Sequence, residues 1–293
     1  MTAERKKGLL FASAGSIFWG SSGIAGQFLL INENIAPEWL TFFRLLCAGF
    51  LLLLLSHFLK GNISAIWKDR RDRRALLIFS AFGMLGTQYG YFASIRCSNA
   101  PTATILEYLM PILIIFWYCL SEKRWPRTVE IFCALFAITG TALIATGGDF
   151  RSLSISGKAL FWGLLSALAC ALYTVEPVGI IKKYGAPLVV GWGMFLASFV
   201  LLPVVALTPF TGTVDMPVLL SFAYVVLFGT ICSFVLYLGS VAYILPAEAS
   251  IISAIEPLSS IIFSFLIFHL TFGFWELMGM ALIILAVVVV ARK

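Results

Sequence analysis

Three acidic residues lie within strongly apolar stretches of the sequence: Glu107, Glu176 and Glu256. A carboxylate is costly in such surroundings, and it persists where it holds a proton or pairs with a cation. Either chemistry moves charge without breaking a bond between heavy atoms. The three residues are therefore candidates for binding or proton coupling, and we favour Glu107 and Glu256 most.

Two prolines add to this pattern. Pro111 cannot donate a backbone hydrogen bond to the carbonyl of Glu107, and Pro257 leaves the carbonyl of Ser253 without its helical donor. Within a bilayer such carbonyls persist only where they face protein or a water-filled cavity. We expect two kinked helices that contribute to one polar region; the alternative is that the prolines only shape helix packing.

Aromatic and amide side chains occur inside the apolar stretches rather than at their ends. A tyrosine hydroxyl or a glutamine amide needs a polar partner there, so we expect a cavity; ordinary helix packing is the alternative. The cavity residues predicted in this way are Trp19, Gln88, Tyr89, Tyr91, Tyr108, Trp162, Tyr173 and Tyr237.

One cation, Arg44, also lies within an apolar stretch. It either meets Glu107 across the protein or extends toward the aqueous interface near Glu38, and we favour a structural role. The six cysteines have no paired spacing, so neither a disulfide framework nor a metal site is expected. No motif calls for a cofactor.

The overall composition places these residues in lipid. The chain of 293 residues is 61% hydrophobic and 12% charged, with a mean hydropathy of +1.00. That leaves too little polar surface to cover a soluble globule of this size. The net charge of +6 does not indicate nucleic-acid binding, because the cations fall between apolar runs.

Apolar runs of roughly 20 residues are long enough to cross the hydrocarbon as helices. Ten such runs predict an all-α integral membrane protein with ten transmembrane helices. The predicted spans are residues 8–31, 38–59, 75–96, 101–121, 128–147, 157–180, 187–207, 217–243, 247–268 and 273–291.

The sequence repeats itself at an offset of 146 residues. We expect two five-helix repeats, residues 1–150 and 151–293, and an odd number of spans per repeat makes the second inverted relative to the first. The aligned residues include Tyr91 with Tyr237, Pro111 with Pro257, and Glu130 with Glu276.

The cations between the spans predict the orientation, because positively charged loops stay in the cytoplasm. Cytoplasmic termini leave only Arg96, Arg151 and Lys158 on the outer side. The same arrangement places on the inner side Arg5, Lys6, Lys7, Lys60, Lys68, Arg70, Arg71, Arg73, Arg74, Lys123, Arg124, Arg127, Lys182, Lys183, Arg292 and Lys293.

Several motifs resemble the EamA-like branch of the drug/metabolite transporter superfamily over about residues 8–291. They are the duplicated Phe-Trp-Gly that contains Trp19 and Trp162, FFRLLCAGFLLLL, TATILEYLMP and SAIEP. The resemblance implies a ten-helix carrier of the inner (plasma) membrane that moves small metabolites, amino acids, amines, purines or drugs, most often outward. An acid at Glu107 departs from the family pattern, which favours a cationic or zwitterionic substrate or proton coupling.

Two inverted halves can pack in two near-equivalent ways, one open inward and one open outward, which is the basis of alternating access. We therefore predict a secondary transporter whose partners are a small-molecule substrate and the lipid bilayer. The alternative is a flippase or a membrane-embedded enzyme acting on a lipid-linked substrate. The sequence has no HExxH, G-x-S-x-G or Walker motif that would support catalysis. Direction, coupling ion and oligomeric state are left open.

Overall fold

The computed structural model describes residues 3–59, 62–149, 154–240, 243–244, 249 and 252–291, and the regular secondary structure within these ranges is helical. In the first half the helices are α1 (Ala3–Gln27), η1 (Phe28–Asn32), α2 (Pro37–Phe58), η2 (Ala65–Trp67), α3 (Arg70–Ile78), η3 (Phe79–Met84), α4 (Leu85–Cys97), α5 (Ala100–Glu107), α6 (Met110–Ser121) and α7 (Thr128–Thr146). In the second half they are α8 (Gly157–Val175), α9 (Val178–Tyr184), α10 (Ala186–Leu207), α11 (Met216–Val226), η4 (Leu227–Cys232), α12 (Ser233–Ser240), α14 (Ile255–Phe268) and α15 (Phe274–Ala291).

Several of these helices are suited to a membrane. Seven segments are long and apolar enough to cross a membrane. Two shorter apolar helices follow them in the chain, namely α14 and residues Phe274–Val289 of α15. The predicted span 75–96 falls on the continuous run of α3, η3 and α4, which is less apolar because it contains Gln88 and two tyrosines. The count of ten spans therefore stays a prediction. The seven segments are Ala3–Asn32, Pro37–Phe58, Ala100–Ser121, Thr128–Thr146, Gly157–Val175, Ala186–Leu207 and Met216–Tyr237.

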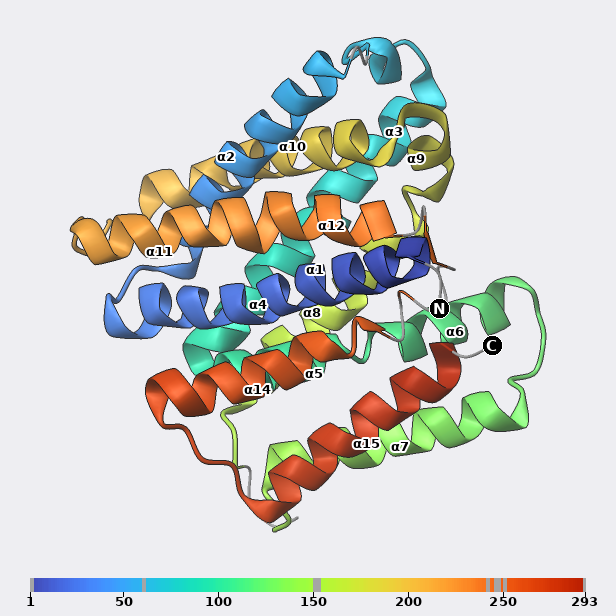
Figure 1. Ribbon diagram of the computed structural model, residues 1–293, viewed down its shortest axis with the longest axis vertical. Coiled ribbons are helices and arrows are strands. Elements are labelled where there is room, and N and C mark those ends of the chain that lie inside the picture. The colour runs from blue at the N-terminus through green and yellow to red at the C-terminus, as the bar shows by residue number, and fades with distance from the viewer. Residues whose placement is uncertain are drawn as a thin grey trace.

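The helices lie side by side in a stack (Figure 1). At one end of the long axis α2 packs against α10, and at the opposite end α7 packs against α15. Between these pairs, α4 packs against α8, and α1 packs against both α12 and α14. The short helix α5 contacts α8 and α14. The centre of the stack therefore joins segments from both halves of the sequence.

The outward faces of the helices are apolar, as a lipid environment requires. Large side chains such as Phe132, Ile138, Phe161 and Leu168 are more than half exposed. Outward apolar surface of this extent marks contact with lipid rather than with water.

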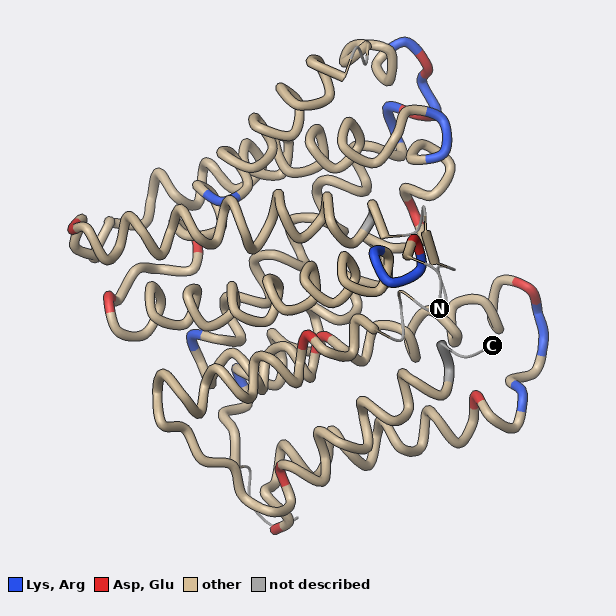
Figure 2. Tube along the Cα trace, viewed as in Figure 1, with Lys and Arg blue, Asp and Glu red and all other residues tan. Residues whose placement is uncertain are grey.

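Lysine and arginine gather along one edge of the stack (Figure 2). This edge contains the first turns of α1, the connection from α2 to α3, helix α9 and the connection from α6 to α7. The ion pairs in and beside these segments include Lys183 Nζ with Asp72 Oδ2 at 2.6 Å and Arg124 Nη1 with Glu130 Oε2 at 2.8 Å. This edge of the stack therefore differs in charge from the opposite edge.

Candidate functional site

Two broken helices position the favoured carboxylates. The Asn99 side chain accepts a 2.9 Å hydrogen bond from Thr102 N and begins α5, which ends at Glu107. Two turn residues follow before α6 begins at Met110. In the second half Glu256 lies in the first turn of α14. Each carboxylate therefore lies beside a break in its helix.

The backbone at the two breaks differs from the expectation in one respect. No described backbone amide donates to the carbonyl of Glu107, as predicted from Pro111. The carbonyl of Ser253, however, accepts a 2.9 Å hydrogen bond from Glu256 N. The prediction that Pro257 leaves this carbonyl unpaired is therefore wrong, because the turn before the proline closes with a shorter-range bond.

Glu107 and Glu256 lie near each other and differ in their partners. The Ser166 hydroxyl of α8 donates to Glu107 Oε2 and also lies 3.1 Å from the carbonyl oxygen of Thr87. No described donor hydrogen-bonds to the carboxylate of Glu256, whose charge interacts with those of Glu107 and Arg44. One acidic residue from each half thus contributes to a common electrostatic site.

Arg44 supplies a positive charge near the two carboxylates. Its Nε donates to Thr230 Oγ1 at 3.0 Å and its Nη2 to the carbonyl oxygen of Gly229 at 3.3 Å, both in η4. Its guanidinium carbon lies 5.1 Å from the ring centroid of Phe92. Arg44 is thus held by η4 and α4, and its charge acts on Glu107 at a distance rather than through a direct contact.

A pair of hydroxyl contacts connects the two breaks. The Tyr108 hydroxyl, between α5 and α6, lies 2.9 Å from Ser253 Oγ, just before α14. Ser253 also interacts with the hydroxyl of Tyr237 on α12. These three predicted cavity residues therefore form one polar group across the two halves.

Aromatic rings flank this group on the side of α1. The Trp19 ring centroid is 5.1 Å from that of Tyr237 and 5.4 Å from that of Phe234. The neighbouring Gly20 brings α1 so close to α14 that a methyl group there would overlap the carbonyl oxygen of Glu256. Trp19 is thereby fixed beside the helix that carries Glu256.

A second aromatic group lies between α4 and α8. The rings of Tyr89 and Trp162 meet edge to face, with centroids 5.2 Å apart. The Tyr89 hydroxyl donates a 3.1 Å hydrogen bond to Glu38 Oε1 at the start of α2. This group therefore joins α2, α4 and α8.

Four further residues were predicted from the sequence: Gln88, Tyr91, Tyr173 and Glu176. Tyr91 lies 3.0 Å from Thr104 Oγ1 through its hydroxyl, and the Oε1 atom of Gln88 is buried without a partner among the described residues. The ring of Tyr173 packs against that of Phe79 at a tilt of 31°, with centroids 5.5 Å apart. Glu176 follows the end of α8, and its carboxylate has no described hydrogen bond or ion pair. Glu176 is thus not brought into the group.

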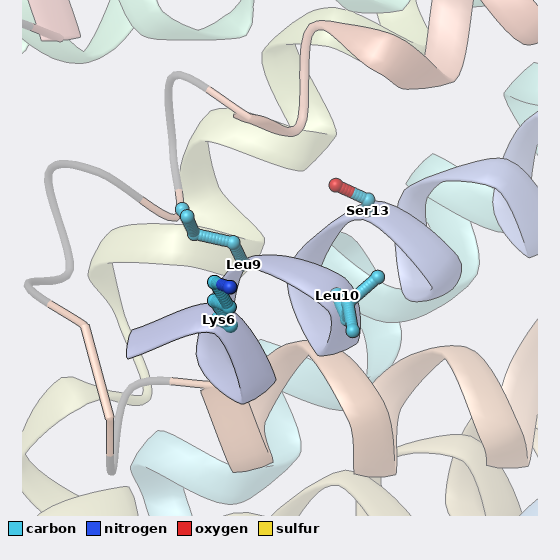
Figure 3. Close-up of a pocket in the computed structure, with 4 residues that line it drawn as sticks. All are labelled: Lys6, Leu9, Leu10 and Ser13. Atoms are coloured by element: carbon cyan, nitrogen blue, oxygen red, sulfur yellow. The ribbon is translucent and has the colours of Figure 1, made fainter. Parts of the chain in front are cut away.

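Two hollows on the surface lie apart from these residues. One of about 300 Å³ is lined by Lys6, Leu9, Leu10 and Ser13 on the first turns of α1 (Figure 3). Another, of about 390 Å³, lies between α6, α7 and α8, and its described lining is almost wholly apolar. Neither hollow is lined by the polar residues described above.

Comparison with known proteins follows the same division of the chain into halves. The sequence profile of the EamA-like transporter family matches residues 6–146 and again residues 157–292. The chain belongs to the EamA-like transporter family. This confirms the resemblance to the drug/metabolite transporter superfamily and the role of the protein as a membrane transporter.

Relatives of this EamA-like transporter span its whole length. An uncharacterised inner membrane transporter of Salmonella typhimurium (strain LT2), YicL, is 38% identical over 286 residues, which cover 98% of this chain and 95% of the relative. The uncharacterised transporter YdeK of Bacillus subtilis (strain 168) is 26% identical over 273 residues, 90% of each chain. A solved crystal structure shares the fold with a TM-score of 0.64 and 14% identity, covering 97% of this chain and 96% of the other.

Sequence reasoning missed several polar neighbours in this EamA-like transporter. Ser166 holds Glu107, and Thr230 with the Gly229 carbonyl holds Arg44. Ser166 lies four residues after Trp162, hence on the same helix face, and this spacing was the available signal. For Thr230 there was none, because its partner lies 186 residues away in the chain.

Proposed function

We propose that this membrane transporter moves a small metabolite by alternating access through a site between two inverted five-helix halves, residues 1–150 and 151–293. The substrate classes are those implied by the family: amino acids, amines, purines or drug-like solutes. Transport is outward across the inner membrane, and ten helices cross it. The observation that carries the proposal is the meeting of Glu107 and Glu256, one from each half, at the broken helices.

The helix pairing supports two related halves. Helices α2 and α10 occupy equivalent places in the two halves, and so do α7 and α15. The two members of each pair pack against each other. Exchange of the halves likewise turns the contact of α1 with α12 into that of α8 with α4. Such a relation is expected of inverted repeats, in which small shifts open one face and close the other.

The charge distribution supports cytoplasmic termini. The described cations gather at the edge where α1 begins (Figure 2), and α15 ends near the same edge (Figure 1). Loops rich in lysine and arginine stay in the cytoplasm. Impermeant amine labelling of intact cells should therefore leave Lys123 and Lys183 unmodified, whereas Lys158 should react.

The two carboxylates provide the chemistry of coupling. In an ionised form each can pair with a substrate amine, and in a neutral form each can carry a proton from one side to the other. Because both lie near Arg44, the charge state of one affects the other. A proton and a cationic group of the substrate can thus replace each other at the site.

Purified protein in liposomes tests this function. Counterflow of amino acids, amines and purines should be measured with and without an imposed pH gradient. Glu107→Gln or Glu256→Gln should abolish counterflow or uncouple it from the gradient, whereas Glu122→Gln is the matched control because Glu122 lies in an exposed loop. Unchanged counterflow in both test variants would refute the site.

A further inference from the structure

The ionised site carries more negative than positive charge. Glu107 and Glu256 interact with each other and with Arg44, and no other described lysine or arginine is among the electrostatic partners of either acid. Two carboxylates and one guanidinium leave one excess negative charge. A buried excess charge is unfavourable unless a proton or a bound cation balances it.

Arg44 is not available to a substrate carboxylate. Only 6% of its surface is exposed, and its donors point to Thr230 and to the carbonyl of Gly229. Phe92 covers the guanidinium at 5.1 Å. Arg44 therefore serves as a fixed counter-charge behind the carboxylates rather than as an anion-binding group.

Two amides at the helix breaks already have acceptors. The amide of Glu256 is used by Ser253 at 2.9 Å, and the amide of Ile112 by Leu109 at 3.0 Å. Pro111 and Pro257 have no amide hydrogen to offer. The N-terminal turn of α14 already contains an anion, the Glu256 side chain, at the position where the helix dipole favours one.

A buried hydroxyl beside Glu256 lacks a partner. Ser260 lies one turn beyond Glu256 on the same face of α14, is fully buried, and has no hydrogen-bond partner among the described residues. A serine oxygen accepts hydrogen bonds from an ammonium group. Ser260 thus offers such a group an acceptor in addition to the carboxylates.

The neighbouring rings suit the rest of such a molecule. Trp19 packs against Phe234 and Tyr237, and Tyr237 interacts electrostatically with Glu256. Aromatic faces attract cations and pack against flat apolar bodies. The surroundings of Glu256 therefore combine a carboxylate, an unpaired hydroxyl and aromatic rings.

We propose that the substrate is an organic cation with a protonated amine, an aromatic or apolar body and no carboxylate. This assignment rests on the proposed function and narrows its substrate classes. The ammonium group pairs with Glu256 and Glu107, and the body packs against Trp19 and Tyr237. A zwitterion brings a carboxylate for which the described residues of the site offer no free positive group.

A matched set of probes tests this assignment: tyramine, a cation; tyrosine, the zwitterion with the same body; and 4-hydroxyphenylacetate, the anion. Each should compete with radiolabelled tyramine for the purified full-length protein in detergent. We expect tyramine to bind at least tenfold more tightly than tyrosine, and the anion not to compete. Glu256→Gln should weaken tyramine binding at least tenfold, whereas Glu122→Gln should leave it unchanged.

The outcomes separate the two proposals. Equal or tighter binding of tyrosine, or no binding of tyramine, overturns the cation assignment. If Glu107→Gln and Glu256→Gln still abolish counterflow of another solute class, the transport function stands without it. Should Glu256→Gln fail to fold, Glu107→Gln provides the second binding test, and an unchanged tyramine affinity there contradicts the assignment.

Discussion

The third helical run of each half contains a π-helical turn, and the two turns are held in different ways. In the first half η3 contains Gly83, and in the second half η4 contains Gly229, which aligns with Gly83 at the offset of 146 residues. Arg44 donates to η4, whereas no described cationic side chain hydrogen-bonds to η3. The repeat has thus kept the wide turn, a feature common at functional sites, and changed its side-chain support.

The carboxylates differ in the same manner. Glu107 accepts a hydrogen bond from Ser166, whereas Glu256 has no such partner among the described residues. One acid is therefore held by a side-chain donor, whereas the described residues supply no such donor to the other. The two halves thus share a backbone plan but support their acidic residues differently.

Removal of the cation that holds η4 should have the largest effect. Arg44→Leu leaves two buried carboxylates without their described counter-charge and removes the hydrogen bonds of Arg44 to Thr230 and Gly229, so we expect a loss of about 3–5 kcal/mol in the free energy of unfolding. Unfolding in mixed detergent micelles measures it. Arg71→Leu, on an exposed turn of α3, is the control and should cause no measurable change. A similar small change in both variants would show that Arg44 does not support η4.

Alanine substitutions at the two π-turn glycines, Gly83 and Gly229, should differ in whether a second substitution relieves the loss of stability. A methyl group at Gly229 would overlap the side chain of Ser22, whereas at Gly83 it would lie 3.0 Å from the Cα atom and 3.2 Å from the amide nitrogen of Tyr173. Each alanine substitution should destabilise the protein by about 1–3 kcal/mol. Because its obstacle is a side chain, Gly229→Ala should be relieved in a Ser22→Gly background.

The backbone obstacle at Gly83 gives the matching negative control. Tyr173→Ala retains the Cα and amide nitrogen atoms, so it should not relieve Gly83→Ala. The same unfolding assay measures both double variants against their own single-variant backgrounds. Rescue at both positions, or at neither, would remove the distinction between the two turns.

Loss of the hydroxyl that fixes Glu107 should have a smaller effect. Ser166→Ala removes one hydrogen bond to a carboxylate, and about tenfold slower counterflow at subsaturating substrate is expected, equivalent to about 1.4 kcal/mol. Ser198→Ala, a buried serine of α10 outside the site, is the control. Equal rates in the two variants would mean that Glu107 does not need to be fixed.

The smallest expected difference concerns the caps of the last helix in each half. Glu130 Oε2 accepts a 2.7 Å bond from Arg127 N, and Glu276 Oε2 accepts a 2.8 Å bond from Gly273 N. Glu130 also pairs with Arg124, whose Nη1 lies 2.8 Å from Glu130 Oε2. This pairing stabilises the folded state only while the carboxylate is ionised, so its contribution is complete well above the ordinary glutamate pKa and decreases at lower pH.

Unfolding midpoints of Glu130→Gln and Glu276→Gln between pH 7 and pH 3 test this point. At pH 7 the first variant should be the less stable, because glutamine keeps the cap and loses the pairing with Arg124. That deficit should begin to shrink below about pH 4.5, where the carboxylate of the unfolded chain takes up a proton. A deficit that does not change with pH would contradict the stated role of Glu130.

Local sequence predicted the parts of the structure that depend on local chemistry. Apolar length indicates membrane helices, and the prolines correctly indicated breaks beside Glu107 and Glu256. The alignment of Glu130 with Glu276 corresponds to equivalent backbone contacts in the two halves. These features follow from nearby residues and from the periodicity of a helix.

Contacts between distant helices were not accessible in the same way. The charge of Arg44 acts on Glu107, one of the two neighbours considered for it, but its acceptors Thr230 and Gly229 were not predicted. Glu38, the other neighbour considered, accepts a hydrogen bond from Tyr89. Which face of one helix meets another depends on side-chain packing along the whole interface. Four of the cations used to predict the orientation lie outside the described residues: Lys60, Arg151, Arg292 and Lys293.

Access to Ser253 from the two sides of the membrane tests the central claim most directly. Ser253→Cys is introduced after replacement of the six native cysteines, and labelling with an impermeant maleimide is followed in right-side-out and inside-out vesicles. A site between two alternating halves predicts labelling from both sides, with protection from both by one transported substrate. Labelling from one side only, or from neither, would contradict alternating access through this site.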